Sequence, residues 1–200
     1  MAMGRPRAFD MDQALDQALH VFWEKGYDGA SIADLTEAMG INPPSLYAAF
    51  GNKEALFKKA LDRYEAKRDQ IMEEAFAAPT AREAVTRLLE GTAERLSDKC
   101  SPRGCLMVQG ALSGGEECEA VKRDLSSRRA GGEALIRKRL KRAKREGDLP
   151  SNVDAAALAR FVATVMYGMA VQAGGGAAPR SSRHCQYGVE GLACMTAKPA

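Results

Sequence analysis

Histidine is scarce in this sequence: His20 and His184 are the two that occur among 200 residues. The five cysteines form neither a CxxC pair nor an even set, so we expect no structural zinc site and no other cofactor. With no signal peptide recognised, such cysteines are typical of reduced thiols in a cytosolic protein. These cysteines are Cys100, Cys105, Cys118, Cys185 and Cys194.

Aromatic residues are also few, at 6%, and no long segment alternates apolar and polar residues with a period of two. Ala, Leu, Glu, Lys and Arg recur instead, which favours helices over strands. The longest apolar stretch, residues 161–173, is shorter than the ~20 residues of a membrane span. We therefore expect an all-α protein that is soluble and cytoplasmic, with no membrane partner.

The motifs of the common enzyme classes are missing as well. The sequence has no serine nucleophile elbow, no phosphate-binding loop and no metal-ligand cluster. A thiol enzyme would use Cys105, but it would need a nearby base, and His20 lies in a separate predicted domain. We expect no enzymatic activity.

Charge alone does not indicate a nucleic-acid partner. The formal net charge is +3 at pH 7, and up to Lys53 the acidic side chains outnumber the basic ones. The most basic run, residues 137–145, is either a second nucleic-acid patch or a solvated helix face. We favour the solvated face, because Ile136 and Leu140 facing inward would turn the charges outward.

Four helices are predicted in the N-terminal part. Each has a capping side chain at its start, and the first three end at a glycine. The caps are Asp10, Ser31 (with Asp34 as its capping-box partner), Asn42 and Asn52, and the glycines are Gly26, Gly40 and Gly51. Pro43 stands at the first position of the third helix, where its missing N–H is harmless. The second and third helices, joined by a turn of about three residues, make a bihelical DNA-binding motif.

A helical bundle is predicted for the rest of the chain, which makes about nine helices in all. The expected features are a fifth helix capped by Thr80, a short sixth from Cys105, a seventh over residues 116–146 bent at Gly131 and Gly132, an eighth capped by Asn152 or Ser151, and a weak ninth from Ser182. We expect one domain over residues 1–52 and another over residues 78–200, connected by a helix over residues 53–77.

The predicted third helix has two different faces at 100° per residue. Its inward face would carry Pro43, Leu46, Tyr47 and Phe50, and its outward face Pro44, Ser45, Ala48 and Ala49. Small, uncharged outward residues suit close approach to a surface, and the major groove of DNA admits a helix. The alternative is a solvated turn of a helical bundle, where such residues would be unusual.

These residues resemble a known family. The runs ASIADL (30–35), GI (40–41) and SLYAAFGNKEAL (45–56) are similar to the helix-turn-helix of TetR/AcrR transcriptional regulators. The resemblance implies that Tyr47 and Lys53 grip the DNA backbone and that Ser31 binds a phosphate. It also places Asn42, Pro44, Ser45 and Ala48 towards the bases.

Two features qualify this DNA-binding expectation. The family often has lysine, arginine or glutamine where this chain has Pro44 and Ala48, so contacts with thymine methyl groups and DNA shape should contribute more than hydrogen bonds to bases. The arm with Arg5 and Arg7 either reaches a phosphate or the minor groove, or is simply an unattached terminus.

The resemblance also implies that helices five to eight enclose an effector pocket and that the last two helices pair with a second subunit. We expect a small apolar effector, because methionines and other apolar residues are available for the wall. These residues are Leu88, Cys105, Met107, Val108, Phe161, Met166 and Met169. The alternative is that they are ordinary core residues.

The expected function is that of a DNA-binding repressor, a homodimer on a near-palindromic operator of double-stranded DNA that the effector releases. Two alternatives remain at this point. One is a DNA-binding adaptor without an effector. The other is a redox-sensing regulator that uses Cys100 or Cys105, since a thiol near a helix N-terminus is activated.

Overall fold

The computed structural model describes residues 9–112 and 119–176, and within these ranges the chain forms helices and no strand. This confirms the all-α expectation. The helices are α1 (Met11–Gly29), α2 (Ile32–Met39), α3 (Pro43–Phe50), α4 (Lys53–Phe76), α5 (Ala81–Ser97), α6 (Leu106–Leu112), α7 (Glu119–Arg145) and α8 (Ala155–Gly174). Arg5, Arg7 and the expected ninth helix from Ser182 lie outside the described residues.

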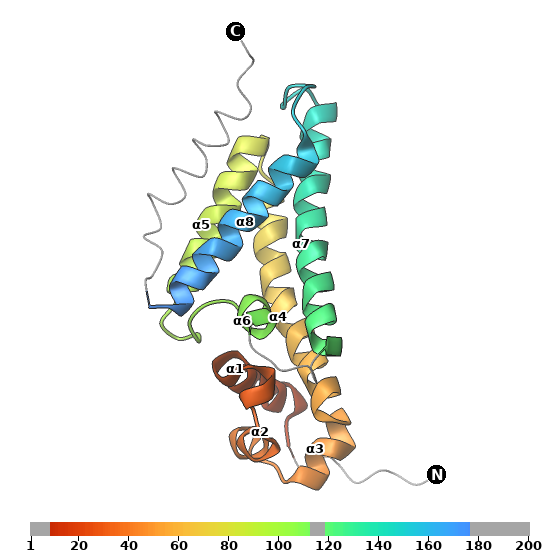
Figure 1. The fold of residues 1–200 in the computed structure, drawn as a ribbon, viewed down its shortest axis with the longest axis vertical. Coiled ribbons are helices and arrows are strands. Elements are labelled where there is room, and N and C mark those ends of the chain that lie inside the picture. Colours follow the sequence, from red (N-terminus) through yellow and green to blue (C-terminus); the bar gives the residue numbers. More distant parts are fainter. Residues whose placement is uncertain (1–8, 113–118, 177–200) are drawn as a thin grey trace, which may run out of the picture.

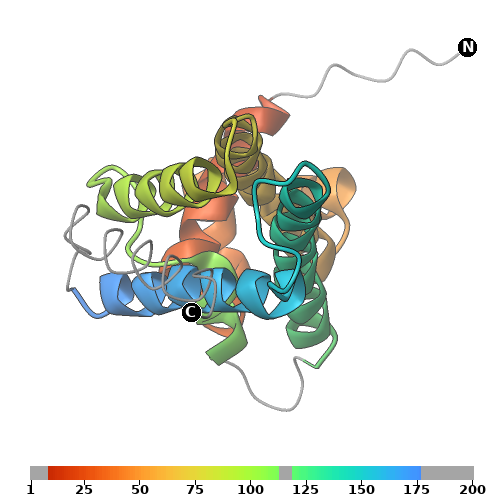
Figure 2. The same ribbon diagram turned by 90° about the horizontal axis from the view of Figure 1, so that it is seen from above.

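The helices form a small N-terminal group and a larger bundle (Figure 1). The N-terminal group is α1, α2 and α3, and α4 extends from it into the bundle, where it packs against α5. Within the bundle α8 runs from beside α7 to beside α5 (Figure 2), and α6 lies between α1 and the bundle. Both α4 and α6 therefore connect the two groups.

The helix starts in the N-terminal group are the expected ones. Asp10 accepts hydrogen bonds from the backbone of α1, Asn42 from that of α3 and Asn52 from that of α4. Ser31 and Asp34 form a reciprocal capping box at α2. These bonds satisfy backbone N–H groups that have no partner inside their helices.

The helical conformation of α1 is interrupted at Gly26, which has φ of +72°, as expected for the glycine that ends the first helix; a short further helical segment reaches Gly29. One helix start differs from the expectation. The eighth helix is capped by Asp154 rather than by Asn152 or Ser151. Val153 is buried and its N–H donates to Pro150, so the chain is still in a turn at residues 151–153 and the helix begins after it.

Helix α7 is continuous through Gly131 and Gly132, so the expected bend is wrong. Gly132 is buried, and a Cβ there would lie 3.7 Å from Arg68 Nη1 and 3.8 Å from Tyr167 Oη. Packing against α4 and α8 thus holds α7 helical where two glycines weaken its local preference.

The basic run of α7 is mostly on a solvated face, as expected, with Lys138, Lys141, Arg142 and Arg145 exposed, but Arg139 is an exception. Arg139 is 5% exposed. Its Nε donates to the carbonyl of Phe76 at 3.2 Å and its Nη2 to that of Ala78 at 2.8 Å. Because the last carbonyls of a helix have no partner within it, Arg139 satisfies the C-terminal end of α4.

Helix α8 is longer than the apolar stretch seen in the sequence. Within the described ranges it is the one helix that is long and apolar enough to span a membrane, with a mean hydropathy of 1.3. However, it packs against α5, α6 and α7, with Leu158, Val162 and Met169 buried. These contacts place the buried side of α8 in the bundle core.

Candidate functional site

The turn between α2 and α3 fixes the angle of α3. Gly40 has φ of +65°, a conformation that favours glycine, and the N–H of Ile41 donates to the carbonyl of Thr36 at 3.1 Å. Beyond the turn, Leu35, Leu46 and Phe50 are buried together in the core. The apolar side of α3 is thereby fastened to α2 and α4, and the other side is left outside.

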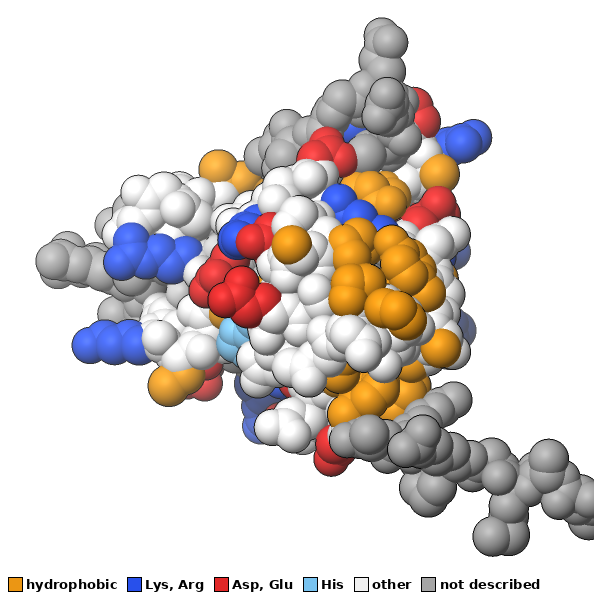
Figure 3. All heavy atoms as spheres, turned by 90° about the horizontal axis from the view of Figure 1, so that it is seen from below, with side chains coloured by type: hydrophobic (Ala, Val, Ile, Leu, Met, Phe, Trp, Pro, Cys, Tyr) orange, Lys and Arg blue, Asp and Glu red, His pale blue; other side chains and the backbone are white. Residues whose placement is uncertain are grey.

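The outer side of α3 is uncharged. Pro44 and Ala48 are exposed, and Ser45 and Ala49 are half-buried. Tyr47 is 49% exposed and Pro43 is exposed as well, so the expectation that they pack inward beside Leu46 is wrong. Ala49, expected on the outer face, packs partly against the core. On the face seen from below, where α3 lies, hydrophobic side chains gather and charged ones lie beside them (Figure 3).

Ser31 and Asn42 stand at the starts of α2 and α3, and both are exposed. The Ser31 hydroxyl accepts from the N–H of Asp34 at 3.0 Å and donates to its carboxylate at 2.7 Å. Asn42 Oδ1 accepts from the N–H of Ser45 at 2.9 Å. Both side chains therefore cap helices whose N-terminal dipoles favour an anion nearby.

Asp34 joins α2 to α1. Lys25 Nζ contacts its carboxylate at 2.5 Å. The hydrogen bond from Lys25, followed by those from the hydroxyl and backbone N–H of Ser31, holds the pKa of Asp34 well below its usual range. At neutral pH this carboxylate is ionised and keeps the start of α2 in place.

Lys53, the first residue of α4, is half-buried. Its ammonium group lies 4.6 Å from the centre of the Tyr27 ring. A cation over an aromatic face is held without losing its charge. Lys53 is thus a positioned cation at the N-terminal end of the helix that follows α3.

A cavity of about 40 Å³ lies in the bundle between α4, α5, α6, α7 and α8. Four of the seven expected wall residues line it, namely Leu88, Cys105, Met107 and Met166. The other three, Val108, Phe161 and Met169, do not, and they belong instead to the core or pack against it. The sequence cannot distinguish a methionine that lines a cavity from one that packs in the solid core, because both are buried apolar positions on their helices.

The cavity wall also contains polar side chains that were not expected from the sequence. They are Tyr64 and Arg68 on α4, Thr92 and Arg95 on α5 and Tyr167 on α8. Tyr64 and Arg68 stand one turn apart on α4, a spacing that puts them on one face. That spacing was the available signal, but only the packing of α4 shows that this face points inward.

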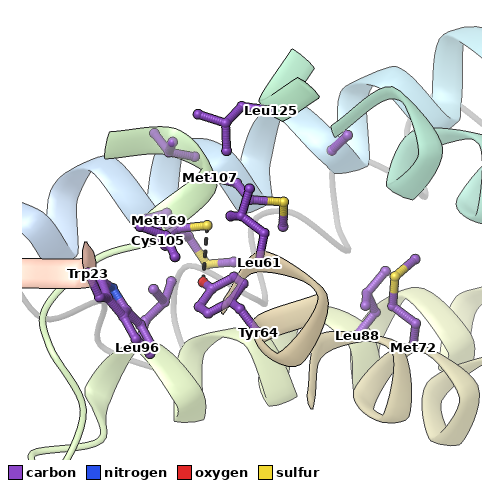
Figure 4. Packing of buried hydrophobic residues seen from close by; sticks show 14 of the residues in the cluster. Trp23, Leu61, Tyr64, Met72, Leu88, Leu96, Cys105, Met107, Leu125 and Met169 are labelled. Carbon is purple, nitrogen blue, oxygen red and sulfur yellow. Dashed lines mark hydrogen bonds between the residues drawn. The ribbon is translucent and has the colours of Figure 1, made fainter. Parts of the chain in front are cut away.

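Three of the wall residues form a hydrogen-bonded chain. Arg95 Nη1 donates to Tyr64 Oη at 2.7 Å, and that hydroxyl donates to Cys105 Sγ at 3.2 Å. Figure 4 shows the Tyr64 hydroxyl pointing at the Cys105 sulfur, with Met107 and Met169 nearby. Burial raises the pKa of Tyr64 well above its ordinary value, so the phenol stays protonated at neutral pH.

Comparison with known proteins gives the family. Residues 14–60 match the bacterial regulatory proteins of the tetR family, and residues 80–184 match the tetracyclin repressor-like C-terminal domain. The chain belongs to the TetR family. Its helix-turn-helix is formed by α2 and α3, and the protein is a helix-turn-helix transcriptional regulator. The relatives are regulators rather than enzymes.

Three relatives show how far the similarity extends. The regulator is 35% identical to the transcriptional repressor ComR of Escherichia coli K12, over 87% of this chain and 84% of ComR. It is 38% identical to the repressor BdcR of the same strain, over 55% of this chain and 56% of BdcR. A cysteine variant of the TetR-family regulator CifR, solved with 26-base-pair operator DNA, is 46% identical with a TM-score of 0.89, covering 94% of this chain and 98% of that one.

Proposed function

We propose that this regulator represses transcription as a cytoplasmic homodimer on a near-palindromic operator and leaves the DNA when a small effector enters the bundle. The observation that carries the DNA-binding part is the uncharged outer side of α3, with exposed Pro44 and Ala48 and the positioned cation of Lys53 at its end. ComR and BdcR are named as repressors, and CifR was solved on operator DNA. We propose no enzymatic activity.

In this proposal α3 enters the major groove. Pro44, Ser45 and Ala48 face the bases, where small side chains suit thymine methyl groups and leave the rest of the discrimination to DNA shape. Tyr47 and Lys53 contact the backbone, and the starts of α2 and α3, at Ser31 and Asn42, face phosphates. Arg5 and Arg7 add a contact from the arm.

The proposed division of labour gives DNA binding to residues 1–52 and effector binding and dimerisation to residues 78–200, with α4 between them. Arg63 of α4 supports this coupling, because it binds Asp16 of α1 through Nε at 2.6 Å and through Nη2 at 2.7 Å. A bidentate arginine–carboxylate pair transmits a displacement of α4 to α1 better than a single contact would.

We assign the subunit contact mainly to α8. Val171 on this helix is 53% exposed, and Phe161 and Val165 are half-buried on it. Apolar side chains that the core of a single chain leaves partly or largely exposed fit an interface with a second copy.

Selection of bound fragments from genomic DNA tests the operator part. We expect the enriched sequence to consist of two inverted half-sites about one helical turn apart. Enrichment of a single half-site, or of no sequence at all, would contradict a dimeric repressor. Effector release is tested separately, by screening small molecules for loss of operator binding in fluorescence anisotropy.

A second candidate trigger is oxidation of Cys105. It is favoured by one observation, the hydrogen bond that its sulfur accepts from Tyr64 at the cavity wall. Hydrogen peroxide would convert the thiol to a sulfenic acid and release water. The proposal is supported if peroxide treatment abolishes operator binding in the unmodified protein and in Cys100→Ser but not in Cys105→Ser. If peroxide leaves operator binding of the unmodified protein unchanged, oxidation is ruled out as a trigger.

A further inference from the structure

The two arginines of the cavity wall have different partners. Arg68 is held by carboxylates, with Glu65 at 3.0 Å and Asp69 at 2.7 Å. Arg95 has no ion pair among the described residues; it interacts with the Tyr64 hydroxyl, with the Tyr64 ring at 5.4 Å and with the Cys105 sulfur. The charge of Arg68 is neutralised by neighbouring carboxylates, whereas no described residue neutralises that of Arg95.

The rest of the wall offers no compensating charge. Among residues 9–112 and 119–176, no aspartate or glutamate lines the cavity, and most of its other residues are apolar. Arg95 also lines a surface groove between α4 and α5. Glu74, Glu90 and Glu94 line the same groove, but none of them forms an ion pair with Arg95. A partly buried guanidinium beside an apolar space is poorly solvated, so an anion placed in that space would be stabilised.

The neighbouring groups suit one end of such an anion. The Arg95 guanidinium has donors beyond the one given to Tyr64, and guanidinium groups match carboxylates through two parallel hydrogen bonds. Leu88, Ile136 and Met166 provide an apolar surface for the remainder of the ligand. The wall therefore combines one cationic position with a hydrophobic body, which differs from the purely apolar site that the sequence suggested.

We propose that the effector of this regulator is an aliphatic carboxylate whose carboxyl group pairs with Arg95 and whose chain lies among the apolar residues of the cavity. This rests on the proposed effector-controlled function and names the chemical class of its ligand.

The size of the cavity gives the ligand a mechanical effect. At about 40 Å³ it is much smaller than the ~300 Å³ or more of a typical ligand pocket. A carboxylate of several carbons enters only if α4 and α5 move apart or the flexible side chains of Met72, Met107 and Met166 rearrange. The ligand thus binds an expanded state more tightly than the compact one, which is the condition for shifting the equilibrium between them.

The test uses straight-chain carboxylates from butanoate to decanoate and the corresponding primary amides, which match them in shape but carry no charge. Binding to the full-length regulator is measured by calorimetry, and release of operator DNA by fluorescence anisotropy. We expect at least one carboxylate to bind tenfold or more tightly than its amide and to release the DNA.

Variants of Arg95 then locate the charge. Arg95→Gln should remove the preference for carboxylate over amide, and Arg95→Lys, which keeps the charge, should retain part of it. Arg87→Gln is the matched control, because Arg87 is exposed on the same helix. Circular dichroism and operator binding without ligand confirm that each variant is folded.

The possible results separate this proposal from the proposed function. If no carboxylate binds more tightly than its amide, or if Arg95→Gln keeps the preference, the carboxylate proposal is wrong, although amides that release DNA would still support effector control. If carboxylates bind through Arg95 without changing DNA affinity, the ligand class stands and effector-controlled repression is wrong.

Discussion

Single residues around α3 show how few charges the proposed DNA contact needs. Acidic residues outnumber basic ones in the N-terminal part. The net charge of this domain therefore does not attract it to DNA. The contact rests instead on placed groups such as Lys53, held over Tyr27, and on the exposed Tyr47. Such groups position the protein on the phosphates without reading sequence.

Replacing Lys53 with alanine tests this at the residue scale. We expect weaker binding to all sequences alike, and a salt dependence of log K lower by about one unit per subunit, because one phosphate contact and its counterion release are lost. Tyr47→Ala should weaken binding just as uniformly with a smaller change in the salt slope. Lys58→Ala, on the same helix and already paired with Glu54, is the control. A changed sequence preference with an intact salt slope would show that Lys53 reads bases.

Asp34 gives a pH dependence. Its folded pKa is lowered by Lys25 and Ser31, so its stabilising effect is present above the unfolded value of ~3.9 and is lost as the pH falls from there through the folded pKa. Asp34→Asn should therefore lower the free energy of unfolding at pH 7, and the difference from the unmodified protein should shrink below about pH 4. Urea unfolding from pH 7 to pH 3 measures it, with the exposed Glu37→Gln as control. A difference that is constant with pH would contradict the assignment.

At the scale of elements, two helical glycines have opposite surroundings. A Cβ on Gly91 of α5 would lie 2.9 Å from Ile71 Cγ2 of α4, whereas a Cβ on Gly131 of α7 would meet nothing within 4 Å. Gly91 lets α5 approach α4 closely, and Gly131 only weakens its helix.

Alanine at these two positions forms a matched pair. Gly131→Ala should stabilise the protein by about 0.5–1 kcal/mol through helix propensity. Gly91→Ala should destabilise it by about 1–3 kcal/mol, because α5 must shift away from α4. Thermal unfolding of both variants measures the difference. If both variants are stabilised equally, α5 can shift away from α4 without loss of folding free energy, and close packing at Gly91 is not required.

At the scale of the whole molecule, the proposed homodimer depends on α8. Val171→Glu should weaken dimerisation without harming the core, because Val171 is 53% exposed in the single chain. Leu135→Glu, with 40% exposure on α7, is the control. Sedimentation should show a shift towards monomer for Val171→Glu, together with weaker binding to a two-half-site operator. If Val171→Glu leaves the dimer unchanged, the subunit interface does not include this part of α8.

The sequence alone determined the start of each helix in the N-terminal group and, with it, the helix-turn-helix. A cap such as Asn42 bonds to a backbone N–H three residues further along, so everything it needs is in the local sequence. Gly40 and Pro43 act in the same way, through their own backbone geometry.

The tertiary structure alone decided which side chains meet. Arg95, Tyr64 and Cys105 come from three parts of the chain, separated by 31 and 41 residues from Tyr64, and Arg139 reaches carbonyls more than 60 residues away. The helical period placed Tyr47 with Leu46 and Phe50, yet α2 and α4 cover a narrower side of α3 and leave Tyr47 outside. Periodicity gives the direction of a side chain around its own helix, but burial and partners depend on which other helices pack there, and that is set by the packing of the whole bundle.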